Sequence, residues 1–268
     1  LKSAETPYAP ELPKDQTIKL METPGLFGGE SASLLMKPLY GARVARPDLY
    51  VGIQQLASEI TRWSAECDRR LHRLCCYMFG SKDLVLTGKL DTSKTKHFVL
   101  RYWPDADLCG NPFTDKSTSG MWLELADSKG NSFPIMWKAN KQTSTAQHTC
   151  EAETCSAANG LKSEAIPAQQ LMSIILGSPL DLELMEDNAA CIIAMKKGYS
   201  PAMRYLSRTQ KVSIGLLHGL TETPPPPGSG KVTVVKADTA IHRGDMFTKA
   251  LNVHSFQTAI ARIGLAKL

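Results

Sequence analysis

WPDADLCGNPFTDKSTSG, residues 103–120, is the stretch that decides the fold prediction. The aromatic and β-branched run 98–103 leads into it and predicts a strand. Asp105 and Asp107 follow, and Gly110-Asn111-Pro112 then predicts a turn. Carboxylates just past the end of a buried strand are held rigidly and still reach solvent, which favours a metal-dependent site. The alternative is that both aspartates only cap the turn, as aspartates often do.

The composition predicts a globular protein. The 268 residues are 43% hydrophobic, which is enough for the core of one or two domains. The net charge of +5 is compatible with a polyanionic partner but does not require one. No apolar run is long enough to span a membrane and no signal peptide opens the chain, so we expect no membrane partner. Because the chain begins at Leu1 rather than Met, we expect it to be part of a longer polypeptide.

The cysteines point to the compartment. There are seven, an odd number, and none has the paired spacing of a structural zinc site. We therefore predict reduced thiols in an intracellular, cytoplasmic protein.

The N-terminal part predicts an arm followed by helices. Residues 1–30 are rich in proline and glycine and are typical of an extended arm or linker. Residues 31–94 contain two helical patterns. The first follows Arg46-Pro47-Asp48, because proline and then aspartate suit the first turn of a helix. The second pattern has its apolar positions between Cys67 and Met78, and the predicted helix ends at Gly80.

Two groups of basic residues are candidates for contact with nucleic acid. Arg69, Arg70 and Arg73 lie on one face of the second helical pattern. Arg204, Arg208 and Lys211 lie near the start of a helix predicted over 199–223. These cations either contact phosphates or only solvate the surface.

Residues 95–268 alternate between strand and helix patterns. Three strand patterns separated by turn residues, over 98–103, 120–125 and 133–137, predict an antiparallel meander. After a helix over 148–165, the chain predicts strands over 180–186 and 231–237 with helices between them. This order is typical of an α/β domain.

Four acids lie at the ends of these elements or on a packed helix face: Asp105, Glu153, Asp187 and Asp245. Clustered carboxylates repel one another, so they persist as anions only with cations between them. A site of oxygen ligands without His or Cys indicates Mg²⁺ or Mn²⁺. Two such ions suit the in-line hydrolysis of a phosphodiester.

Five motifs in the same order resemble the polyprotein of copia-type LTR retrotransposons. PDADLCGNPFTDKSTSG resembles that family's "SDADWAGD…KSTSG", and FPIMWKANKQ resembles "ISWxSKKQ". CEAET is similar to "TEAEY", LMEDNAACIIAM to "LxCDNxSAIxLA", and GDMFTKAL to "ADIFTKPL". Upstream, MKPLYGARVARPDLYVGIQQLASEITR resembles the thumb and connection part of a reverse transcriptase. The resemblance covers 34–268.

The resemblance implies a ribonuclease H-like domain over 95–268. Its fold would be a five-stranded mixed sheet of order 3-2-1-4-5 flanked by helices, preceded by a small helical, thumb- or connection-like subdomain over 31–94. The implied activity is hydrolysis of the RNA strand of RNA–DNA hybrids with two Mg²⁺ or Mn²⁺ ions. The implied partner is the remainder of the reverse transcriptase polyprotein, and the implied location is a virus-like particle.

The resemblance also implies roles for single residues. Asp105 would bridge both ions, Glu153 and Asp187 would complete one site, and Asp245 the other. Asp107 and Glu151 would be secondary. The chain departs from the family at Leu108-Cys109, Asn111, Thr154 and Gln210-Lys211, which spares the implied ligands. It lacks the Tyr-x-Asp-Asp turn of a polymerase, so we expect no primer extension.

Two other functions stay open at this stage. The chain could be a non-catalytic module that holds hybrid through its basic helices, or a structural spacer within a larger polyprotein. Cleavage of hybrid separates the nuclease from both, and a gel shift separates the module from the spacer.

Overall fold

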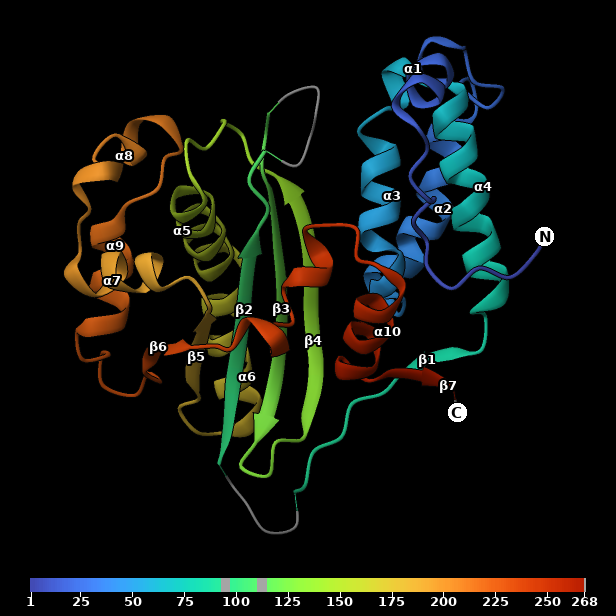
Figure 1. The fold of residues 1–268 in the computed structure, drawn as a ribbon. Helices are drawn as coiled ribbons and strands as arrows, with labels where there is room; N and C mark the ends of the chain where they lie inside the picture. Colours follow the sequence, from blue (N-terminus) through green and yellow to red (C-terminus); the bar gives the residue numbers. More distant parts are fainter. Residues whose placement is uncertain (93–96, 110–114, 268) are drawn as a thin grey trace. The chain divides into compact units, whose positions relative to one another are not determined.

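The computed structural model describes residues 1–92, 97–109 and 115–267, which divide into two compact units (Figure 1). The first unit comprises Leu1–Thr87 with Lys249–Leu268, and the second comprises Gly88–Thr248. The turn predicted at Gly110-Asn111-Pro112 lies outside the described residues. Within the described residues, no helix is both long and apolar enough to cross a membrane.

A five-stranded mixed sheet forms the centre of the second unit. Its strands are β2 (Phe98–Ala106), β3 (Thr118–Asp127), β4 (Ser132–Lys141), β5 (Asp181–Glu186) and β6 (Val232–Lys236). They lie in the order β4-β3-β2-β5-β6, with β2, β3 and β4 antiparallel and β2, β5 and β6 parallel (Figure 1). Counted from β2, this order is 3-2-1-4-5. The predicted α/β fold with a five-stranded mixed sheet is therefore confirmed.

The turn between β3 and β4 explains why these strands pair as a hairpin. The Asp127 carboxylate accepts the backbone N–H groups of Lys129 and Asn131, both at 2.9 Å. The side-chain amide of Asn131 donates to it as well, at 2.8 Å. These hydrogen bonds stabilise the ionised carboxylate and hold the pKa of Asp127 down to about 2. The turn predicted between the strand patterns 120–125 and 133–137 is thus confirmed.

Helix α5 (Thr149–Gly160) packs against β2 and β3. It continues through a π-helical turn, Leu161–Ala165, into α6 (Ile166–Leu176). The Tyr102 hydroxyl of β2 donates to the Ser156 carbonyl at 2.9 Å. A Cβ atom on Gly160 would lie 2.1 Å from that hydroxyl, so only glycine lets the helix approach the sheet this closely. Gly160 thus lies where α5 packs closest to β2.

The segment between β5 and β6 contains α7 (Ala189–Lys197), α8 (Leu206–Thr209) and α9 (Ile214–Glu222), with a 3-10 turn at Pro201–Met203. The prediction of one helix over 199–223 was wrong. Lys211 adopts a left-handed backbone conformation, with φ of 59°, which cannot continue a helix. Ser213 then caps the start of α9 by accepting the backbone N–H of Leu216.

The first unit is mainly helical. It contains α1 (Lys14–Glu22), α2 (Ser31–Val44), α3 (Tyr50–Ala57), α4 (Ala65–Gly80) and α10 (Val253–Arg262), with 3-10 turns at Pro47–Leu49 and Ile60–Arg62. Residues 1–30 thus include a helix, although we expected an extended arm. Phe256 packs edge-on against Tyr77, with ring centroids 5.6 Å apart. Strand β7 (Leu265–Lys267) pairs antiparallel with β1 (Leu84–Leu86).

These last contacts explain where the chain divides. We expected one domain over 95–268, whereas residues 249–268 pack with the N-terminal helices. The reason is that Phe256 of α10 packs against Tyr77 and that β7 pairs with β1. The thumb- or connection-like character of the N-terminal helices stays a prediction.

A buried ion pair fixes the start of the 3-10 turn before α3. The Arg46 guanidinium donates two hydrogen bonds to Asp48, at 2.9 and 2.7 Å. The Asp48 side chain is fully buried and also accepts the Tyr77 hydroxyl at 2.7 Å. Arg46-Pro47-Asp48 therefore does more than open a helix, because it ties the turn to α4.

Candidate metal centre

The site lies at the carboxyl ends of two neighbouring strands. Because β2 and β5 are adjacent and parallel, their last residues meet at the same edge of the sheet. Asp105 is the last residue but one of β2 and is paired with Gly120 of β3. Glu186 ends β5, and Asp187 follows it.

Glu153 reaches this edge from α5 and is 5% exposed. Burial raises its pKa well above the usual range, and the negative charges of Asp105, Glu186 and Asp187 raise it further. Its Oε2 atom is buried and has no hydrogen-bond partner among the described residues. A carboxyl group in this position keeps its proton unless a cation lies beside it.

Glu186 is a member of the site that the sequence analysis missed. It is 1% exposed, and burial first, then the charges of Asp187 and Asp105, raise its pKa to about 8. The Asn188 backbone N–H donates to its Oε1 at 3.0 Å, while Oε2 is a second buried oxygen without a partner in the described part of the chain. The alternation of β5 could have identified it, because Leu182, Leu184 and Glu186 share the buried face.

Asp187 lies at the rim of the site and is partly exposed. Its Oδ2 accepts the Thr239 hydroxyl at 2.8 Å, and the Lys236 ammonium donates to its backbone carbonyl. Asp187 is thus held by β6 and by the segment that follows.

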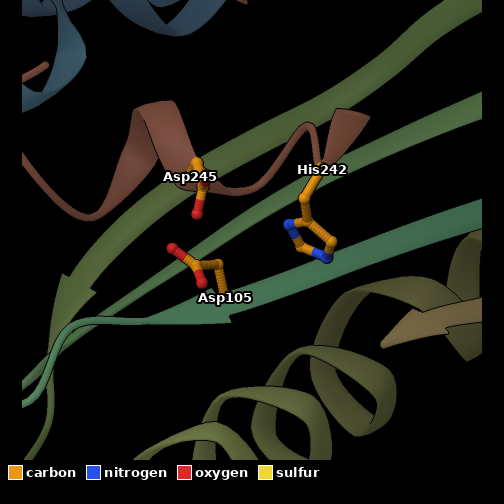
Figure 2. A group of neighbouring side chains, drawn as sticks. All are labelled: Asp105, His242 and Asp245. Carbon is orange, nitrogen blue, oxygen red and sulfur yellow. The ribbon is translucent and has the colours of Figure 1, made fainter. Parts of the chain in front are cut away.

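That following segment brings His242 and Asp245 over the end of β2. Asp245 opens a single 3-10 turn, Asp245–Phe247. One ligand atom from each of Asp105, His242 and Asp245 lies within 4.8 Å of the other two (Figure 2). Sequence reasoning missed His242, since only its position three residues before Asp245 hints at the site.

Close packing holds this segment against β2. A Cβ atom on Gly244 would lie 2.8 Å from Cβ of Asp105 and 2.9 Å from the Trp103 carbonyl oxygen, which leaves room only for glycine. The Thr248 hydroxyl donates to Asp105 Oδ2 and also lies 3.1 Å from the Asp245 carbonyl oxygen.

A buried ion pair anchors the same segment on the sheet. Arg243, between His242 and Asp245, donates to Glu124, whose side chain is fully buried on β3. Glu124 also accepts the indole N–H groups of Trp103 and Trp122, at 3.0 and 2.9 Å. Arg243 therefore holds the segment that contains His242 and Asp245 against the sheet.

The two acids expected to be secondary are bound to nearby groups. Asp107 accepts the backbone N–H of Thr118. Glu151 accepts the backbone N–H of Gln147 and the Tyr205 hydroxyl, both at 2.9 Å. These bonds fix the chain next to Asp105 and at the start of α5.

The basic residues fall in both units. On α4, Arg69 and Arg70 donate to Glu66 at 2.7 and 2.8 Å, and Arg73 donates to the Thr6 carbonyl at 3.0 Å. In the second unit, Arg204 and Arg208 are exposed.

Lys211 lines a cavity of about 400 Å³ together with Lys138, Lys141 and residues of α5. Lys138 forms an ion pair with Glu164 at 2.8 Å. The proposed contacts of the basic residues with nucleic acid stay predictions.

The residues of the site fit a hard divalent cation. Carboxylate oxygens are the ligands that Mg²⁺ and Mn²⁺ prefer. Glu153 and Glu186 each keep one buried oxygen without a hydrogen-bond partner in the described residues, which is where a cation would supply the missing interaction.

No family model matches the sequence, and no curated protein matches it. Among solved structures, the chain is similar to the RNase H1 of the halophilic archaeon Halobacterium salinarum NRC-1, with 13% identity and a TM-score of 0.36 over 56% of this chain and 93% of that one. It is also similar to the protease–reverse transcriptase of prototype foamy virus, with 12% identity and a TM-score of 0.28 over 67% of this chain and 22% of that one. At these TM-scores the fold rests on the strand order and directions of the sheet itself.

Proposed function

We propose that the chain is a metal-dependent ribonuclease H that hydrolyses the RNA strand of RNA–DNA hybrids. One observation carries the proposal: carboxyl groups from β2, α5 and β5 crowd at one edge of the sheet, and two of them keep buried oxygens without partners among the described residues. Such crowding is unfavourable without cations. The motif resemblance gives the substrate class and the wider polyprotein.

In this proposal each acid has a role. Asp105 would be shared by two ions, because it contributes to the raised pKa of Glu153 and also lies beside Asp245. Glu153 and Asp187 would complete one site, and Asp245 would belong to the other. Two divalent ions would supply activation of water and stabilisation of the charge that develops on the phosphate. Thr248 and Gly244 keep the Asp105 carboxylate in place.

The substrate would be held through its phosphates. Arg204, Arg208 and Lys211 belong to the same unit as the acids. Contacts of this kind carry no base specificity and weaken with salt. Arg69, Arg70 and Arg73 would add contacts from the first unit. The remainder of a reverse transcriptase polyprotein is the proposed partner, within a cytoplasmic particle.

Cleavage of end-labelled RNA in an RNA–DNA hybrid tests the proposal, with single-stranded RNA and duplex DNA as competing substrates. We expect the RNA of the hybrid alone to be cut, only with Mg²⁺ or Mn²⁺, leaving 3′-hydroxyl and 5′-phosphate ends. A chain that shifts hybrid in a gel but never cuts it is a binding module. A chain that does neither is a structural part of the polyprotein.

A further inference from the structure

His242 is a buried imidazole beside two carboxylates. It is 3% exposed, and one of its ring nitrogens lies within 4.8 Å of carboxylate oxygens of Asp105 and Asp245. Figure 2 shows one ring nitrogen facing these carboxylates and the other facing away from them. The site is thus not made of oxygen atoms alone.

The hydrogen bonds of the ring identify the nitrogen that can bind a metal. Nε2 lies 3.0 Å from the Met185 backbone carbonyl oxygen. Because a carbonyl can only accept, the proton of the neutral ring is on Nε2. Nδ1 then carries the lone pair and faces the carboxylates, and the Gly244 N–H donates to it over a long 3.3 Å. An imidazole that ligates a metal typically donates its other N–H to a carbonyl or carboxylate in this way.

The ring is also held against rotation. It packs edge-on against Trp103, with centroids 5.5 Å apart and an interplanar angle of 79°. The next residue, Arg243, is fixed by Glu124. A ligand held in advance loses little conformational entropy when the metal binds.

Glu153 is a second unsatisfied group beside Asp105, outside the group formed by Asp105, His242 and Asp245. Its side chain has a buried oxygen without a partner among the described residues, and Asp105 is the first of the charges that raise its pKa. This carboxyl comes from α5, whereas His242 comes from the segment after β6.

We propose that His242 ligates one metal ion through Nδ1, together with Asp105 and Asp245, and that this ion is Mn²⁺ in preference to Mg²⁺. Mg²⁺ favours oxygen ligands almost exclusively, while first-row transition ions accept imidazole nitrogen. A mixed nitrogen–oxygen site therefore selects between the two ions that an all-oxygen site would bind alike. The inference deepens the proposed function, since it concerns one of the two ions that the nuclease needs.

Calorimetric titration of the full chain with Mn²⁺ alone and with Mg²⁺ alone tests the selectivity. His242→Gln keeps a donor for the Met185 carbonyl and removes the Nδ1 ligand, and His254→Gln at an exposed position is the matched control. Loss of an outer partner of a ligand typically costs about 10–100-fold in metal affinity. We therefore expect the Mn²⁺ dissociation constant of His242→Gln to rise at least about tenfold, with little change for Mg²⁺ or for the control. Equal weakening for both ions, or none, contradicts the proposal.

Pulsed electron paramagnetic resonance of the Mn²⁺-loaded wild-type chain gives the direct readout. A coupling from a directly bound imidazole ¹⁴N is expected in the wild type and in His254→Gln, and its absence from the wild type overturns the proposal. Because this measurement is made on the wild-type chain, it tests the proposal even if circular dichroism shows that His242→Gln does not fold. Nitrogen coupling without hybrid cleavage keeps this inference and removes the proposed function, whereas cleavage without the coupling does the reverse.

Discussion

Replacing Arg243 by Met tests how the segment with His242 and Asp245 is held over β2. The Glu124 side chain is fully buried and that of Arg243 is 16% exposed, so the substitution leaves an uncompensated charge inside the sheet. Removing one partner of a buried ion pair typically costs about 3–5 kcal/mol. The two indole donors keep part of the charge stabilised, so we expect a loss near the lower end, about 3 kcal/mol.

A double-mutant cycle separates the charge from the packing. Glu124→Gln removes the charge but keeps an acceptor oxygen for only one of the two indoles, so Glu124→Gln/Arg243→Met should recover part, and not all, of the loss. Arg101→Met is the matched control, because its ion pair with Glu183 is about one-third exposed, with side-chain exposures of 29% and 31%. Such surface pairs are worth about 0–1 kcal/mol.

Urea unfolding followed by tryptophan fluorescence is the assay, since three of the four tryptophans, Trp103, Trp122 and Trp137, lie in the second unit. Mn²⁺ titration of the same variants reports the positions of His242 and Asp245. Arg243→Met with wild-type stability and wild-type metal affinity would refute the anchoring role.

Three further predictions concern stability, pH and binding. Asp48→Ala should cost about 3 kcal/mol, because it leaves the partly buried Arg46 guanidinium without its carboxylate and the Tyr77 hydroxyl without its acceptor. Urea unfolding of the first unit, followed by its Trp63, measures the loss, and an unchanged midpoint would contradict it. Burial and neighbouring charges raise the pKa of Glu153 and Glu186 in the folded chain, so the unfolded chain loses these protons at lower pH than the folded chain. The melting temperature in EDTA should therefore fall as the pH rises from about 4.5 to about 8. Mg²⁺ should reverse this fall. A melting temperature that is flat across this range in EDTA would count against the raised pKa values. Replacing Arg204, Arg208 and Lys211 by Gln should reduce the slope of hybrid affinity against salt by up to about 3, and an unchanged slope would show that these cations only solvate the surface.

The sheet could be predicted from the sequence because its signals are local. The run 98–103 before Asp105, the turn over 127–131 and the alternation over 180–186 each lie within a few residues. The resemblance then supplied the strand order. Glu186 could also have been found, because it continues the buried face of Leu182 and Leu184.

His242 and Arg243 could not be predicted, because their partners are distant in sequence. Arg243 is 119 residues from Glu124, and His242 bonds to Met185 across 57 residues. The periodicity of the sequence gives no information about contacts between residues so far apart. The arginines of α4 are a different case, since Glu66 lies three and four residues before Arg69 and Arg70, a spacing that favours ion pairs within the helix.

The central claim is that the acids at the ends of β2 and β5 bind the ions that cut a hybrid. The most direct measurement is the rate of RNA cleavage in a hybrid by wild type, Asp105→Asn and Asp83→Asn across a Mg²⁺ and Mn²⁺ titration. Asp83 is exposed in the first unit and is the control for the same substitution. We predict that Asp105→Asn abolishes cleavage at every metal concentration. Its metal-free melting temperature should be unchanged near neutral pH and slightly higher at alkaline pH, where Glu153 and Glu186 lose their protons and the amide relieves the repulsion among the carboxylates. Cleavage by Asp105→Asn at the rate of the wild type and Asp83→Asn would contradict the claim.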